Sequence, residues 1–172
     1  MGVAPGAFFP RRIPEKDRMD LEKFKAGLSR YGSGVAIITT REGNGVPSGF
    51  TANSFTSLSL SPPMVLFCLD REAVCFDAFY GSTAFGVNIL NSEQEEISNR
   101  FARRGGNKFQ NLTLMNGDTG IPLIAGCLAN LECRTAQTIP GGDHLIFLGE
   151  VQEVHLGEGD PLFYFKGSYH SI

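Results

Sequence analysis

The chain has 172 residues, 42% of them hydrophobic, and its formal net charge is -3. This length accommodates one compact domain with a hydrophobic core and leaves little room for a second domain. The sequence contains no run of about eighteen apolar residues that could span a membrane, and its basic residues are scattered rather than massed in a stripe. Composition and charge therefore exclude membrane insertion and disfavour extended contact with nucleic acid.

Residues 1–18 are expected to form a flexible tail before a single domain over residues 19–172. The segment places three prolines among neighbouring charges and has neither helical nor alternating periodicity. It also lacks the apolar core and the small-residue cleavage site of a secretory signal, which predicts a cytoplasmic protein.

The four cysteines and three histidines lack the spacing of a metal site. The sequence has no Cys-x-x-Cys pair, and no two histidines lie within one helical turn. We therefore expect buried free thiols and no bound metal.

The first predicted element is an amphipathic helix with Asp20 as its N-cap and Gly32 at its end. Its apolar residues recur with helical spacing, at Leu21, Phe24, Leu28 and Tyr31. A β-branched run over residues 35–40 and a return strand from Val46 flank an Asn-Gly turn signal. This pattern predicts a hairpin.

The middle of the chain mixes short strands with brief helices. Residues 64–69 are apolar at every position, which predicts a fully buried strand. Residues 73–81 are expected to form one or two helical turns, and residues 84–90 another apolar strand. A Ser92-x-x-Glu95 capping box then predicts a helix that ends near Arg103.

Two long segments, 127–138 and 144–156, alternate between apolar and polar residues. Such alternation predicts half-buried antiparallel strands. In the first, one predicted face holds Ala129, Leu131, Cys133 and Thr135, and the other holds Asn130, Glu132 and Arg134. A last strand over residues 162–165 is expected to finish the sheet.

We thus expect six to eight strands and two or three helices. Because strands mostly follow strands, this order favours a mainly β fold, an antiparallel barrel with peripheral helices, over a doubly wound parallel sheet.

Residues 49–63 carry hydroxyl and amide side chains at short intervals along an extended segment. A flavin ring offers several hydrogen-bond acceptors and one donor, and its phosphate accepts bonds from hydroxyls and backbone N–H groups. Such a segment suits the edge of a flavin. Composition by itself favours the alternative, a Ser/Thr-rich edge strand solvated by water.

Five motifs follow one another along the chain: G-F-T-A-N-S-F-T-S-L-S-L-S-P-P-M-V-L-F-C-L-D (49–70), F-G-V-N-I-L (85–90), R-F-A with N-K-F (100–109), G-G-D-H-L-I-F-L-G-E-V (141–151) and P-L-F-Y-F-K-G-S-Y (161–169). In this order they resemble the flavin reductase-like, FMN-binding split-barrel family. The resemblance covers nearly everything after residue 20. It is closest to the small reductase components that supply reduced flavin to two-component monooxygenases.

The resemblance implies a homodimer of antiparallel split barrels that binds FMN or FAD near the dimer interface. It assigns the flavin ring to Thr51, Ala52, Asn53 and Ser54. It assigns the ribityl and phosphate end to Ser57, Leu58, Ser59, Cys68, Leu69 and Asp70. It assigns the flavin tail to Asn88 and Ile89, and the phosphate or adenylate to Phe101, Ala102, Lys108 and Phe109. Asn107 stands where the family often has an acidic residue, which leaves the choice between FMN and FAD open.

The segment Gly141-Gly142-Asp143-His144 combines two glycines, which allow close approach to a planar ligand, with an aspartate that can orient an imidazole. In the family this segment contacts the nicotinamide nucleotide. Without the resemblance, a simple turn into a strand explains it better. Tyr169 could also reach a flavin, whereas His155 is expected to be an exposed strand residue.

These residues together predict an oxidoreductase that uses NADH or NADPH to reduce FMN or FAD and supplies the reduced flavin to a partner monooxygenase. The chain has no G-x-G-x-x-G between a strand and a helix, so the nicotinamide would bind outside a Rossmann fold. Two alternatives remain: a flavoprotein that retains its flavin and passes electrons to another acceptor, and a flavin-binding protein without enzymatic activity.

Overall fold

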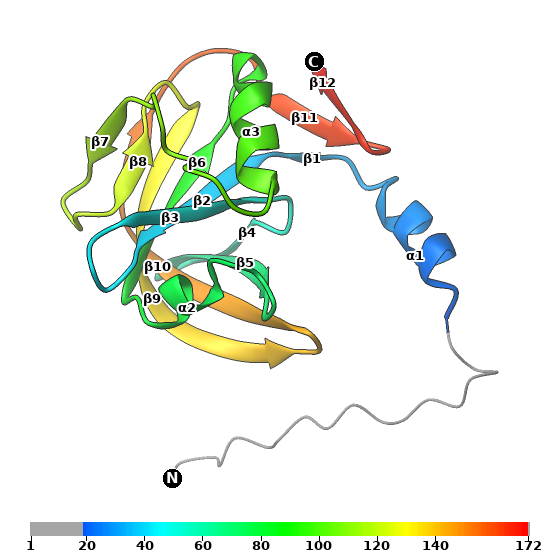
Figure 1. Ribbon diagram of the computed structural model, residues 1–172, viewed down its shortest axis with the longest axis horizontal. Helices are drawn as coiled ribbons and strands as arrows, with labels where there is room; N and C mark the ends of the chain where they lie inside the picture. The colour runs from blue at the N-terminus through cyan, green and yellow to red at the C-terminus, as the bar shows by residue number, and fades with distance from the viewer. Residues whose placement is uncertain (1–18, 172) are drawn as a thin grey trace, which may run out of the picture.

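The computed structural model describes residues 19–171, so the predicted tail over residues 1–18 lies outside the described residues. Its main element is a sheet of seven strands: β2 Ala36–Arg41, β3 Pro47–Ala52, β4 Thr56–Leu60, β5 Pro63–Asp70, β6 Ala84–Ile89, β9 Ala129–Gly141 and β10 His144–Leu156. They lie in the order β3-β2-β6-β9-β10-β5-β4, and every neighbouring pair is antiparallel (Figure 1). The predicted mainly β, antiparallel fold is confirmed.

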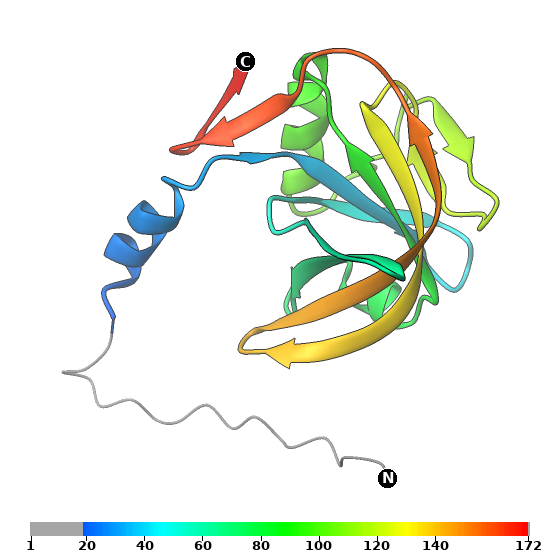
Figure 2. The same cartoon turned by 180° about the vertical axis from the view of Figure 1, so that it is seen from behind.

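The sheet curls, and chain connectivity explains why. Its two edge strands, β3 and β4, are consecutive in sequence and joined only by residues 53–55. A flat seven-stranded sheet would hold its edges about 29 Å apart, whereas the connection reaches at most about 14 Å. The edges therefore approach each other, as the curved strands in Figures 1 and 2 show. Because β3 and β4 do not pair, the barrel stays split at this seam.

Aromatic side chains fill the inside of the curl. The ring of Phe67 stacks on Phe147 at 4.9 Å and meets Phe85 edge-on at 4.9 Å. Phe79, from the short helix α2 (Phe76–Tyr80), is buried against the same cluster. These rings come from β5, β6, β10 and α2, so the core holds distant parts of the chain together.

Strand β5 corrects the prediction of a fully buried segment. Val65, Phe67 and Leu69 are buried, whereas the alternate residues Leu66 and Cys68 are only half-buried. The reason is that one face of the strand meets the core while the other does not. An entirely apolar run does not distinguish the two cases.

Helix α3 (Glu95–Ala102) contacts β2 and β3, after a short 3-10 turn, η2 (Ser92–Gln94). The helical segment is confirmed, but its cap lies one residue earlier than predicted. Asn91 is the N-cap and Gln94 closes the capping box: Glu93 N donates to Asn91 Oδ1, and Asn91 N to Gln94 Oε1, each at 3.0 Å. Asparagine caps a helix as well as serine does, and here the buried Gln94 replaces the glutamate.

The predicted polar face of residues 129–135 is also corrected. Asn130 and Glu132 are buried, although Arg134 is exposed. The alternation itself is right, but residues 114–124 cover this face with the hairpin of β7 (Leu114–Asn116) and β8 (Pro122–Ile124). A second layer of this kind cannot be read from the periodicity of one strand.

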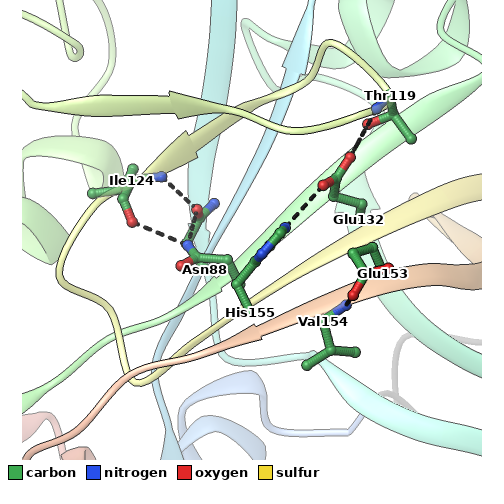
Figure 3. A network of polar contacts seen from close by, with 8 residues as sticks. Asn88, Thr119, Ile124, Glu132, Glu153, Val154 and His155 are labelled. Atoms are coloured by element: carbon green, nitrogen blue, oxygen red, sulfur yellow. Dashed lines mark hydrogen bonds and ion pairs between the residues drawn. The ribbon is translucent and has the colours of Figure 1, made fainter.

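Hydrogen bonds make this covering possible (Figure 3). Asn88 Oδ1 accepts from Ile124 N at 2.7 Å and from Asn130 Nδ2 at 2.8 Å. The carboxylate of Glu132 accepts from the backbone N–H and the hydroxyl of Thr119 at 2.8 and 2.7 Å. Its other oxygen lies 3.0 Å from His155 Nε2. His155 is exposed as predicted, yet it pairs with a buried carboxylate that the sequence did not reveal.

Burial raises the pKa of Glu132, but its hydrogen bonds from His155, Thr119 and Asp118 outweigh burial, and the net effect is a pKa below the ordinary value.

The C-terminal strands do not finish the main sheet, contrary to the prediction. Strands β11 (Leu162–Phe165) and β12 (Ser168–Ser171) form a separate three-stranded sheet with β1 (Ser33–Gly34), in the order β1-β11-β12. With these short pieces the described residues hold twelve strands rather than six to eight. The additional strands include β1, β7 and β8, whose two or three residues carry too little alternation to be recognised.

Helix α1 (Leu21–Leu28) begins as predicted, because Asp20 Oδ1 accepts from Glu22 N and Lys23 N. None of its residues is buried. In Figure 2 the helix stands beside the barrel rather than on it. Among residues 19–171, no helix is both long and apolar enough to cross a membrane.

Candidate functional site

An open cavity of about 340 Å³ lies at the seam of the split barrel, where β3, β5 and the end of α3 meet. It brings together many of the predicted residues from three separate motifs. Those that line it are Thr51, Ala52, Asn53, Ser54, Cys68, Leu69, Asp70, Phe101, Ala102, Lys108 and His144.

Two hydroxyls of the polar segment hold the cavity wall. Ser54 holds the connection between β3 and β4 against β5, because its Oγ accepts from Cys68 N at 3.1 Å and donates to Cys68 O at 3.2 Å. Thr51 Oγ1 donates to the carbonyl of Ser98 in α3 at 2.6 Å. Asn53 is exposed, and its amide makes no hydrogen bond to other described residues. The wall is thus fixed by its own hydroxyls and leaves an amide for a ligand.

His144 reaches the cavity from the start of β10, where it lies opposite Asp70 in β5. Its Nδ1 lies 2.7 Å from Asp143 Oδ1, which fixes the ring. This hydrogen bond, together with the charge of the imidazole, lowers the pKa of Asp143. Gly142 has φ +70°, so the turn before His144 requires a residue that tolerates the left-handed region. Gly141, Gly142 and Asp143 lie outside the cavity lining and position His144.

Lys108 provides a positive charge in the wall. Its Nζ donates to the carbonyls of Phe101 at 2.9 Å and Gly49 at 3.3 Å. Burial lowers the pKa of Lys108, and the nearby Cys75 opposes this effect. Burial raises the pKa of Cys75, which Lys108 only partly offsets. Lys108 also lines a second cavity of about 620 Å³, so the two cavities adjoin.

Phe109 lines this second cavity, and its ring packs edge-on against Phe101 at 4.9 Å. The two cavities have volumes typical of sites for organic ligands. Polar groups on one edge, apolar walls and a cation at the junction fit a planar ring with a phosphate tail.

Some predicted residues lie elsewhere. Ser57, Leu58 and Ser59 are on the edge strand β4, outside the cavity lining, and the first two are exposed. Asn88 is fully buried beneath the β7–β8 hairpin, and its neighbour Ile89 packs against the core. Neither belongs to the cavity lining.

Tyr169 lines a neighbouring hollow of about 200 Å³ that shares Thr51 and Asn53 with the first cavity. Its hydroxyl lies 2.8 Å from Ser98 Oγ, in the same residue whose carbonyl accepts from Thr51. Tyr169 is therefore tied to the cavity wall through α3.

Sequence reasoning missed several lining residues: Phe50, Ala73, Val74, Cys75, Arg103 and Arg104. The adjacent arginines followed by two glycines were the available signal, since a basic pair beside flexible backbone is typical of anion sites. The apolar ones carry no signal of their own. Within the described part of the chain, no group of three or more His, Cys, Asp or Glu residues is arranged to hold a metal ion.

Known proteins share this sequence and architecture. Residues 28–172 match the sequence model of the flavin reductase like domain. The chain is 38% identical to actinorhodin polyketide dimerase from Streptomyces coelicolor, covering 89% of this chain and 87% of that protein. It is 36% identical to HsaB, the reductase subunit of a flavin-dependent monooxygenase from Rhodococcus jostii, with coverages of 91% and 80%. It is 38% identical to the FMN reductase (NADH) SmoA from Agrobacterium fabrum, with coverages of 85% and 83%.

Solved structures agree. The NADH:FAD oxidoreductase SgcE6 from Streptomyces globisporus, in complex with NAD and FAD fragments, superposes with a TM-score of 0.83 at 35% identity and covers 88% of this chain and 92% of its own. The flavin reductase PheA2 gives a TM-score of 0.82 at 34% identity, with coverages of 90% and 99%. By sequence and by fold, the chain belongs to the flavin reductase-like family.

Proposed function

We propose that this protein is an NAD(P)H:flavin oxidoreductase that reduces FMN or FAD and supplies the reduced flavin to a partner monooxygenase. The observation that carries the proposal is the seam cavity, which joins the polar wall of residues 51–54, the Lys108 cation and the oriented His144. Relatives named as reductase components of two-component monooxygenases support it.

The flavin, when bound, supplies the chemistry of accepting a hydride and passing on electrons. The protein needs no acid or nucleophile of its own for this reaction, so its residues act by position. Asn53 and the backbone of residues 51–54 orient the ring edge, and Ser54 holds that backbone against β5. Lys108 lies where a phosphate tail would need a positive charge.

We assign the nicotinamide to the side of the cavity that His144 lines. Asp143 holds Nδ1 of the imidazole, which leaves Nε2 for a ligand. The open cavity suits a donor that enters, reacts and leaves.

A homodimer fits the surface of the described chain. Helix α1 exposes Leu21, Phe24 and Leu28, and Tyr31 is exposed in the turn after it. The edge strand β4 exposes Leu58 and Leu60. Large apolar side chains exposed close together along one helix are typical of an interface. A second copy would cover them, and light scattering of the purified protein tests this assignment.

We infer a cytoplasmic location, because NADH and NADPH are supplied there. The four free thiols fit a reducing compartment. Fractionation of the native host tests this inference.

The reductase activity is tested with purified full-length protein, mixed anaerobically with FMN or FAD and with NADH or NADPH. We expect the visible absorbance of the oxidised flavin to disappear in at least one of the four pairings. Absence of bleaching in all four, with flavin still bound, would contradict the reductase proposal and favour a flavin-binding protein without this activity. Flavin that bleaches but stays bound through gel filtration would instead indicate a protein that passes electrons to another acceptor.

A further inference from the structure

A third hollow, of about 290 Å³, lies just beyond the C-terminal end of α3. It is lined by Arg100 and residues 103–108. Arg103, Arg104 and Lys108 line both this hollow and the first cavity, so the two are continuous. A ligand in the cavity can therefore extend a substituent into the hollow.

The charges around the hollow are unbalanced. Arg100 is paired, because its Nη2 lies 3.0 Å from Glu96 Oε1. Arg103 and Arg104 contact no carboxylate among the described residues, and Lys108 donates only to neutral carbonyls. Three positive charges thus share one hollow in a chain whose net charge is -3. Their mutual repulsion is relieved when an anion binds between them.

The backbone of the same loop adds donors. Gly105 and Gly106 have φ of +76° and +78°, and an added Cβ at either would meet nothing within 4 Å. Conformation rather than lack of space therefore requires glycine at both positions. The N–H groups of residues 104–106 make no backbone hydrogen bond within the described chain. Such exposed amides beside cations form a concave site for oxyanions.

We propose that Arg103, Arg104 and the amides of the Gly105-Gly106 turn bind the phosphate monoester of a nucleotide in the seam cavity. This inference rests on the proposed function, and it assigns recognition to two arginines between R-F-A and N-K-F, to which the resemblance gave no role. A dianionic phosphate matches several cations at once, and guanidinium groups bind its oxygens in pairs. Two sources offer this group: the 5′-phosphate of the flavin and the 2′-phosphate of NADPH.

The first arm compares FMN with riboflavin, which has the same ring but no phosphate. Dissociation constants are measured by fluorescence quenching for wild type, the double variant Arg103→Gln/Arg104→Gln and the double variant Arg103→Lys/Arg104→Lys. If the flavin phosphate binds here, the glutamine variant raises the Kd of FMN about tenfold or more and leaves that of riboflavin within about twofold. The lysine variant retains part of the preference, and added salt weakens FMN binding more strongly in wild type than in the glutamine variant.

The second arm measures kcat/KM for NADPH and NADH with saturating riboflavin as acceptor. If the 2′-phosphate binds here, the glutamine variant lowers the ratio of NADPH to NADH about tenfold, while the Kd of FMN stays unchanged. The control variant Arg134→Gln removes an exposed charge outside the cavities. It should change neither the dissociation constants of the flavins nor the ratio of kcat/KM for NADPH to that for NADH.

The inference is overturned if the glutamine variant keeps both the preference for FMN over riboflavin and the wild-type ratio of kcat/KM for NADPH to that for NADH. Failure of the proposed function would look different. In that case wild type oxidises neither NADH nor NADPH, while the comparison of FMN with riboflavin still reports on the phosphate site.

Discussion

At the scale of single residues, the side chains of the seam divide into those that build the wall and those left for a ligand. The hydroxyls of Thr51 and Ser54 are already hydrogen-bonded to backbone groups of α3 and β5. Asn53 and His144 remain available at the cavity. The sequence shows how many polar groups the segment has, but which of them are already engaged depends on partners 14 and 47 residues away.

We expect His144→Ala to raise the KM for the nicotinamide nucleotide about tenfold, with little change in the Kd of the flavin. The physical reason is that His144 lines the side of the cavity assigned to the donor. Steady-state kinetics at saturating flavin, with a separate flavin titration, measure both quantities. His170→Ala, outside the cavity, is the control. An unaltered KM removes His144 from the site.

Ser54→Ala is expected to weaken the binding of flavin rather than that of the nicotinamide nucleotide. Loss of both hydrogen bonds to Cys68 loosens the seam, so the Kd of the flavin rises several-fold and the protein loses about 1–2 kcal/mol of stability. Flavin titration and urea unfolding measure these changes. A variant that is destabilised but binds flavin as tightly as wild type would show that the seam does not shape the flavin site.

At the scale of elements, the alternation along β9 predicts the strand but not which of its faces is buried. Its alternation predicts a strand correctly, yet residues on its polar face are covered by the β7–β8 hairpin through Asn88 and Glu132 (Figure 3). A polar residue can be buried when another element supplies its hydrogen bonds. These hydrogen bonds come from Thr119 and Ile124, and no pattern in the neighbouring sequence links these two residues with β9.

The buried carboxylate gives a prediction about pH. Because the folded state lowers the pKa of Glu132, its contribution to stability is complete above the unfolded-state value of 4.5 and is lost as the pH falls through the lower folded-state value. Glu132→Gln should cost about 1–3 kcal/mol at pH 7, because the donors from Thr119 lose a charged acceptor. It should also flatten the decline in stability at acidic pH.

Urea unfolding at neutral pH and near pH 4 measures both effects. Glu150→Gln, an exposed change on β10, is the matched control. Equal pH dependence in wild type and Glu132→Gln would show that the network does not stabilise the ionised form.

At the scale of the whole molecule, the site exists because the sheet curls. The edge strands β3 and β4 are drawn together by residues 53–55, and the cavity opens beside this connection. Helix α1 lies beside the barrel with its apolar residues exposed (Figure 1).

If a second copy covers α1, Phe24→Glu should raise the dimer dissociation constant at least tenfold, because a charge would then be buried against apolar side chains. Light scattering across a concentration series measures the change. Lys23→Glu, on the polar side of the same helix, should leave the assembly intact. A Phe24→Glu protein with unchanged mass would exclude α1 from the interface.

The sequence by itself determined the antiparallel, mainly β architecture, the first helix with its Asp20 cap, the hairpin of β2 and β3, and the family. These follow from local propensity, alternation and motif order, which neighbouring residues carry among themselves. Tertiary structure alone decided that the polar wall of residues 51–54 meets Lys108 and His144 at one cavity. It also decided that Asn88 and Glu132 are buried and that Arg103 and Arg104 face a shared hollow. The physical reason is that burial and proximity depend on which distant strands the curled sheet brings together.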